Sequence, residues 1–156
     1  MFEDKPNWLQ ALKEHLGEEK ISFDPERLKD FSHDQTEDIS NLPEVVVRPE
    51  STQDVSIVLR EANKFGIPVT PAAARTGLSG GSIPVFGGIS LSMESLSKII
   101  EIDESNSQAT VEPGVINQVF HEACKNKGLF YPPDPSSWGS STLGGNVAYN
   151  AGGPKA

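Results

Sequence analysis

The amino-acid sequence predicts an α+β fold. Two observations carry this prediction: residues 45–71 read as a strand, a helix and a second strand, and residues 98–112 read as two strands joined by a short turn. The first group is typical of parallel strands joined by a right-handed crossover, and the second of an antiparallel pair. The chain has 156 residues, of which 36% are hydrophobic and 22% charged, so it can bury the core of one globular domain.

Two helices are predicted near the N-terminus. Residues 7–16 place four apolar side chains on one helical face, and Gly17 follows as a stop signal; the four are Trp8, Leu9, Leu12 and Leu16. Asp24 then precedes Pro25, which is the usual order of a capping residue and the first helical residue, so a short helix is expected through Leu28.

The central part of the chain predicts a strand–helix–strand unit. The three valines at 45–47 form a continuous apolar run, which is typical of a buried strand. Ser51 begins a capping box with Asp54 in place of glutamate, and Gly66 ends the helix. We expect its inner face to carry Val55, Val58, Leu59 and Ala62. Residues 67–71 form the next strand, and the two strands are expected to pair in parallel.

Three more strands and a helix are predicted after residue 87. Residues 88–93 alternate in polarity, and residues 98–102 and 108–112 flank a turn at 103–107, which favours an antiparallel pair. Residues 115–127 form an amphipathic helix that Gly128 closes, and its inward residues are expected to be Val115, Val119, Phe120 and Ala123. From residue 130 onward we expect mostly loops and turns.

Composition excludes several classes of protein. The net charge is −9, from 13 basic and 22 acidic residues, which argues against nucleic acid or an anionic membrane as a partner. Cys124 is the only cysteine, so no intrachain disulfide can form, and we expect it to be a small buried helical residue. Residues 1–10 are polar and no apolar run has the length of a membrane span, so we expect a cytoplasmic protein.

The first candidate ligand-binding segment is the loop at residues 71–81. It directly follows a predicted strand, and its small side chains allow the backbone to approach a ligand closely. Successive backbone N–H groups in such a loop can hold a phosphate without a lysine. The loop lacks both the ending of a Walker motif and the Gly-x-Gly-x-x-Gly pattern of a dinucleotide fold. Composition alone leaves a flexible surface loop as an equal alternative.

The second segment runs from residue 131 to residue 153. It contains Pro-Pro-Asp-Pro-Ser-Ser at 132–137, Gly-Gly-Asn at 144–146 and Asn-Ala-Gly-Gly at 150–153. Asparagine tolerates unusual backbone angles and offers both a donor and an acceptor. A loop with only a structural role rarely contains two such stretches of glycine and other small residues.

These two segments, with Glu-Pro-Gly at 112–114 between them, resemble a known family. The motifs Thr-Gly-Leu-Ser-Gly-Gly at 76–81 and Leu-Gly-Gly-Asn-Val-Ala at 143–148 are similar to the FAD-binding domain of the vanillyl-alcohol oxidase and para-cresol methylhydroxylase (PCMH) superfamily. The similarity is closest to the D-lactate dehydrogenase and glycolate oxidase FAD-binding subunits. It runs from about Leu42 to the end, so we expect an N-terminal approach segment at 1–41 and a PCMH-type FAD-binding domain at 42–156.

The resemblance implies that FAD lies between two α+β subdomains, of which the second is incomplete in this chain. It implies three groups of contacts. The pyrophosphate would be wrapped by Ala73, Ala74, Arg75, Thr76, Gly77, Leu78 and Ser79. The flavin and ribityl side would be lined by Thr142, Gly144, Gly145 and Asn146. The pocket near the isoalloxazine ring would be shaped by Pro133, Asp134 and Ser137.

The chain departs from the family pattern in the composition of the first loop and in its own length. Alanines stand at 72–74 where a glycine-rich pair is usual, which bears on the loop's geometry because alanine disfavours positive φ. Members that tether FAD through this loop use a histidine, and the matching residue is Thr76, so a non-covalent flavin is expected. Family members are also longer, and the cap domain that handles the substrate follows the part seen here.

The resemblance therefore implies a flavin-linked 2-hydroxy-acid oxidoreductase whose small-molecule substrate is bound in the complete enzyme. No catalytic residue and no metal ligand is expected in this chain, because His15, His33 and His121 lie on helical or polar stretches away from both loops. The missing C-terminal half or an electron-transfer subunit would be the partner. The alternative is a non-catalytic flavin-binding module that works only with a second chain; a nucleotide-binding domain of another type is disfavoured by the absent motifs.

Overall fold

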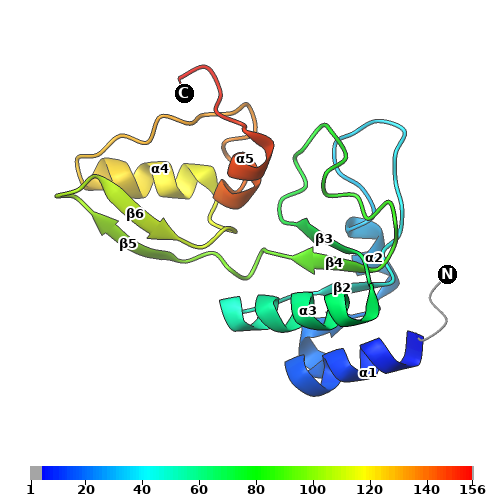
Figure 1. Ribbon diagram of the computed structural model, residues 1–156. Coiled ribbons are helices and arrows are strands. Elements are labelled where there is room, and N and C mark those ends of the chain that lie inside the picture. The colour runs from blue at the N-terminus through cyan, green and yellow to red at the C-terminus, as the bar shows by residue number, and fades with distance from the viewer. Residues whose placement is uncertain (1–4, 156) are drawn as a thin grey trace.

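The computed structural model describes residues 5–155 and confirms the α+β class (Figure 1). Residues 1–4 lie outside the described part. The first lobe holds α1 (Lys5–Leu16), η1 (Glu18–Lys20), β1 (Ile21–Ser22), α2 (Pro25–Asp30), β2 (Val45–Val47), α3 (Thr52–Phe65), β3 (Val69–Ala72) and β4 (Ile89–Ser92). The second lobe holds β5 (Ile99–Asp103), β6 (Gln108–Val111), α4 (Asn117–Asn126) and α5 (Leu143–Tyr149).

The four strands of the first lobe form one sheet in the order β1-β2-β4-β3. Both β2 and β3 run parallel to β4, as expected for a crossover unit, but they flank β4 and do not pair with each other. The predicted β2–β3 pair is therefore wrong. All four residues of β4 are buried, including Ser90 and Ser92, so this strand takes the centre of the sheet.

The main core lies between this sheet and helices α1 and α3, which cover one face (Figure 1). Its buried members are Trp8, Leu12, Leu16, Val45, Val47, Val58, Ala62, Ile67, Ile89 and Leu91. The predicted caps are confirmed, since Ser51 accepts from the backbone of Asp54 and Gly66 adopts the left-handed conformation. Leu59 does not lie on the inner face of α3 as expected, because it is 48% exposed. Glu61 is buried in this helix instead.

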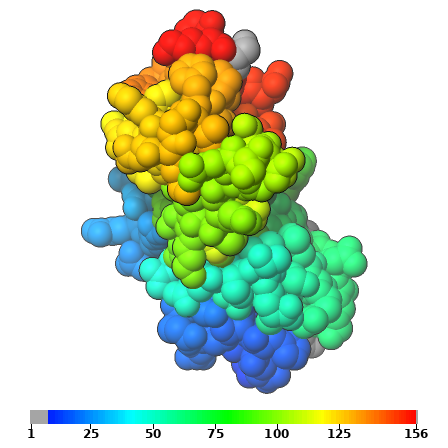
Figure 2. Space-filling view, turned by 90° about the vertical axis from the view of Figure 1, so that its left-hand side faces the viewer, coloured from blue at the N-terminus to red at the C-terminus, as the bar shows by residue number. Residues whose placement is uncertain are grey.

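The second lobe is built on the predicted antiparallel hairpin of β5 and β6. Helix α4 packs Phe120 and Cys124 against it, so Cys124 is buried as expected, and burial raises the pKa of its thiol. Val119 points outward instead of inward, with 53% of its surface exposed, and Ala123 is only half-buried. The buried polar residue on this face is Asn117. In Figure 2 the hairpin lies between the first lobe, in blue and cyan, and the later segments, in orange and red.

Helix α5 corrects the expectation of loop structure after residue 130. Thr142 caps it by accepting from the backbone N–H of Gly145, and Asn150 ends it in the left-handed conformation with φ of 54°. Its buried apolar residue, Leu143, packs into the core of the second lobe. Tertiary packing thus overrides the low helix propensity of two consecutive glycines.

No helix among residues 5–155 combines the length and apolarity that crossing a bilayer requires. Within the same residues, no three side chains of the metal-binding types gather closely enough to hold a metal ion.

Candidate functional site

A cavity of about 540 Å³ lies where the loop after β3 faces helix α5 and the segment before it. In Figure 1 this loop, at the edge of the first lobe, faces α5 at the edge of the second lobe. Every predicted site residue except Pro133 and Asp134 lines the cavity. The remaining lining residues, which were not predicted, are Pro71, Ala72, Gly81, Ser82, Met93, Pro113, Pro135, Ser136, Ser141, Ala148, Tyr149 and Ala151.

The first wall of the cavity is the loop at residues 73–81, and most of its backbone N–H groups have no hydrogen-bond partner among the described residues. The N–H groups of residues 74–79 donate to no acceptor in the described part of the chain. The positive φ that this loop needs falls on Arg75, at 53°, and on Gly80, at 73°. The alanines at 73 and 74 therefore have negative φ angles. The positive φ is adopted by the next residue, Arg75.

The loop is held from outside by residues 34–36, which sequence reasoning did not connect with the site. The N–H of Gln35 donates to the carbonyl of Gly77 at 3.0 Å, and the N–H of Gly80 donates to Oγ1 of Thr36 at 2.7 Å. Asp34 accepts from the buried hydroxyl of Ser82 at 3.2 Å. These contacts fix the loop without using the N–H groups of residues 74–79.

The second wall is α5, which approaches the chain before α4 very closely. A Cβ on Gly144 would lie 2.5 Å from Cβ of Pro113 and 2.9 Å from its carbonyl oxygen. The N–H of Gly144 donates to that same carbonyl at 2.9 Å. Glycine is thus required at 144 by backbone contact, whereas a Cβ on Gly145 would meet only the side chain of Thr142, at 3.1 Å.

Asn117 of α4 holds this wall in place and is a second residue that sequence reasoning missed. It is fully buried, donates to the carbonyl of Pro133 at 3.0 Å, and accepts from the side-chain amide of Asn146 at 3.0 Å. One side chain therefore fixes both the Pro-Pro-Asp segment and the cavity-lining Asn146. A polar residue on the buried face of an amphipathic helix is the signal that could have indicated it.

Tyr149 brings the two walls together. A Cβ added to Gly77 would lie 2.8 Å from its ring, and one added to Gly81 would lie 2.5 Å from its hydroxyl oxygen. The phenol ring therefore rests directly on the glycines of the first loop, and any side chain there would push it away. The contact with Tyr149 therefore requires glycine at positions 77 and 81, apart from any approach of a ligand.

The exposed surface of the cavity is mainly apolar, and among the described residues it carries no unpaired charged side chain. Ser141 is 3% exposed, and its buried hydroxyl has no hydrogen-bond partner among the described residues. Arg75 is the charged residue of the lining, and it is paired with Glu94 at 2.9 Å. A second cavity of about 540 Å³ is lined by Glu94, and its basic residues Lys20, Arg27 and Arg48 are already in ion pairs.

Two predicted site residues, Pro133 and Asp134, lie behind the lining. The carbonyl of Pro133 receives the bond from Asn117, and Asp134 is paired with Lys155, whose hydrogen bond lowers the pKa of that carboxyl. Among the residues that the structure describes, no histidine lines the cavity. His121 instead donates from Nδ1 to the carbonyl of Tyr131, 3.1 Å away.

The comparisons with known proteins give this geometry a family. The family described as "FAD binding domain" matches residues 43–156. The chain belongs to the FAD-binding domain family. The expected resemblance is thus confirmed, and FAD is the cofactor of this domain.

Curated relatives of this FAD-binding domain share its sequence over most of its length. It is 42% identical over 123 residues to glycolate oxidase subunit GlcD of Bacillus subtilis, covering 79% of this chain and 26% of the relative. It is 37% identical over 152 residues to D-lactate dehydrogenase of Anaerostipes hadrus, covering 97% and 32%. The chain therefore spans less than a third of the length of these relatives.

Solved structures confirm the fold of the FAD-binding domain. An alkyldihydroxyacetonephosphate synthase superposes with a TM-score of 0.83 at 21% identity, covering 92% of this chain and 31% of that chain. The 4-ethylphenol oxidase of Gulosibacter chungangensis superposes with a TM-score of 0.77 at 27% identity, covering 90% and 28%. P-cresol methylhydroxylase gives 0.76 at 22% identity, covering 90% and 28%.

The residues present fit an FAD molecule on physical grounds. FAD carries two phosphate charges, and the first loop offers unpaired N–H groups in a chain whose net charge of −9 is otherwise unfavourable to anions.

Proposed function

We propose that this chain is the FAD-binding portion of a flavin-linked 2-hydroxy-acid dehydrogenase or oxidase of the D-lactate or glycolate type. The observation that carries the proposal is the cavity between the loop after β3 and α5, which unites nearly all residues of the two motifs. Relatives named as glycolate oxidase subunit, D-lactate dehydrogenase and D-2-hydroxyglutarate dehydrogenase support the substrate class.

Each part of the cavity has a role in this proposal. Residues 73–79 bind the pyrophosphate through their backbone, which is supported by the free N–H groups there. Thr142, Gly144, Gly145 and Asn146 line the flavin and ribityl side, and Ser137 shapes the pocket near the ring. Pro133 and Asp134 act from behind the lining, where they fix the segment that carries Ser137.

In the whole enzyme, bound FAD would supply the redox chemistry by accepting hydride at N5 from the α-carbon of the hydroxy acid. The contribution of these residues is to bind and orient the cofactor, since no histidine of the described part of the chain lines the cavity. Within the proposal the enzyme is cytoplasmic, and the remaining part of the protein or an electron-transfer subunit completes the site. Residues 1–41 are the approach segment and 42–156 the FAD-binding domain, in line with the family match from residue 43.

The first test is the identity and attachment of the cofactor. Because Thr76 cannot form the tether that a histidine provides, we expect the flavin to be released when the FAD-loaded protein is precipitated with acid. Chromatography of the yellow supernatant should identify FAD. Colour that stays in the pellet, or release of FMN or a nicotinamide cofactor alone, would contradict the proposal.

Gly145→Val tests the position of the cavity. Only the side chain of Thr142 lies near a Cβ at this residue, so the branched side chain extends into the cavity. We expect the Kd for FAD, measured by fluorescence quenching, to rise at least about tenfold through overpacking. Gly139→Val is the matched control, because Gly139 lies outside the lining and a Cβ there meets only Gln118, at 3.4 Å. Equal Kd values for both variants would remove Gly145 from the site.

A further inference from the structure

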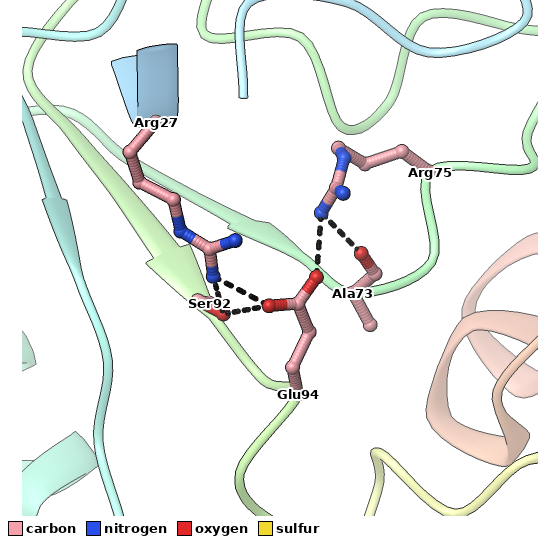
Figure 3. Close-up of polar contacts among 5 residues, drawn as sticks. All are labelled: Arg27, Ala73, Arg75, Ser92 and Glu94. Carbon is pink, nitrogen blue, oxygen red and sulfur yellow. Dashed lines mark hydrogen bonds and ion pairs between the residues drawn. The ribbon is translucent and has the colours of Figure 1, made fainter. Parts of the chain in front are cut away.

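A cluster of three charged side chains supports the cavity loop from its far side (Figure 3). Glu94, which follows β4, accepts from Arg75 at 2.9 Å through one carboxylate oxygen. Its other oxygen accepts from Arg27 of α2 and from the hydroxyl of Ser92 at 3.1 Å. Arg75 also donates to the carbonyl of Ala73, two residues earlier in the same loop. The carboxylate thus joins three segments that are distant in sequence.

Both guanidinium groups also contact one aromatic ring. The central carbon of Arg75 lies 4.2 Å from the centre of the Phe31 ring, and that of Arg27 lies 4.5 Å from it. Phe31 is fully buried. The ring and the carboxylate together fix the plane of the Arg75 guanidinium, so this side chain is held in one orientation.

The backbone of Arg75 is in the left-handed region, with φ of 53°, where side chains other than glycine are unfavourable. The next residues, 76–79, line the cavity, and their N–H groups donate to no acceptor among the described residues. A contact that holds Arg75 therefore also sets the direction of these N–H groups. Burial raises the pKa of Glu94, but the hydrogen bonds from Arg27 and Arg75 outweigh it and lower the pKa, so the carboxylate stays charged at neutral pH.

We propose that Arg75 is a positioning residue of the FAD loop, held in its left-handed conformation by Glu94, and that its side chain is not a ligand of the cofactor's phosphates. This inference rests on the proposed function of the cavity. It assigns phosphate binding to the backbone and gives Glu94, Arg27 and Phe31 the role of a support behind the loop.

The two roles of Arg75 predict opposite effects for Glu94→Gln. If Arg75 binds phosphate, the substitution frees a cation from its partner and removes a negative charge, so an anionic ligand binds more tightly. If Arg75 is a positioning residue, the substitution loosens the loop, and FAD binds more weakly although the chain has become less acidic. The sign of the change in Kd decides between the roles.

The experiment measures the FAD affinity and the hydrogen exchange of the loop amides in the whole chain. We expect Glu94→Gln to raise the Kd about tenfold, as for a lost charge-assisted contact, and to speed exchange of the Gln35 and Gly80 amides, whose hydrogen bonds anchor the loop, in cofactor-free protein. Arg75→Lys should behave in the same way, since lysine keeps the charge but not the planar fork. Glu104→Gln, which breaks the Lys127–Glu104 pair of the second lobe, is the control and should change neither quantity.

Three outcomes separate the possibilities. Unchanged or tighter FAD binding by Glu94→Gln, or full affinity in Arg75→Lys, overturns the positioning role. Unchanged loop exchange in cofactor-free Glu94→Gln also overturns it, whatever the affinity. Failure of the unmodified chain to bind FAD counts against the proposed function, while the exchange experiment still decides whether Glu94 holds the loop.

Discussion

Gly144→Ala is expected to destabilise the second lobe by about 2–3 kcal/mol, the range of a forced overpacking. The added methyl group would lie 2.5 Å from Cβ of Pro113 and 2.9 Å from its carbonyl oxygen. Because one of these atoms is backbone, α5 must move away from the segment before α4. The hydrogen bond from Gly144 to Pro113 is lost with that movement. Chemical denaturation followed by circular dichroism measures the loss.

Gly145→Ala is the matched control for this effect. The two residues are neighbours in the same short helix, so the gain in helix propensity from alanine is the same in both. At 145 the nearest atom is a side-chain oxygen of Thr142, at 3.1 Å, which can shift. We expect less than half the destabilisation of Gly144→Ala. Equal stabilities of the two variants would mean that the contact with Pro113 does not place α5.

Asn117→Leu is expected to cost about 3 kcal/mol of unfolding free energy, although leucine has a similar volume. The substitution leaves two groups without partners, the buried side-chain amide of Asn146 and the carbonyl of the half-buried Pro133. Since Asn146 lines the cavity, the affinity for FAD should fall together with the stability. Thermal unfolding with and without FAD measures both effects.

Asn126→Leu provides the comparison for Asn117→Leu. Asn126 is the last residue of the same helix and is exposed, so its replacement leaves no buried group unpaired. We expect its stability to stay within about 0.5 kcal/mol of the unmodified chain. If Asn117→Leu were equally harmless, the asparagine pair would have no part in holding the second wall.

The sequence predicted most elements because their signals are local. Ser51 and Gly66 bound α3 as expected, and the turn between β5 and β6 falls at the predicted residues. Expectations failed where the answer depended on a distant partner. Leu59 and Val119 have apolar side chains that suit an inner face, yet helix rotation is set by what packs opposite, and Glu61 and Asn117 are buried instead.

The strand order shows the same limit. The chain order β2, α3, β3 favours direct pairing of the two strands, but β4 arrives later and takes the position between them. A strand buried on both faces gains more in the centre of a sheet than at its edge. No local signal in residues 45–71 indicates that a later segment will be inserted there.

The sequence by itself determined the α+β class, the FAD-binding family and half of the cavity lining, because two motifs of small residues marked the segments that form its two walls. Only the tertiary structure decided that the second motif is helical and that Asn117 and Tyr149 hold the walls together. It alone brought Arg27 and Glu94 to Arg75. The physical reason is that an ion pair or a close contact depends on separations in space between residues far apart in sequence, which local propensity and motif spacing do not encode.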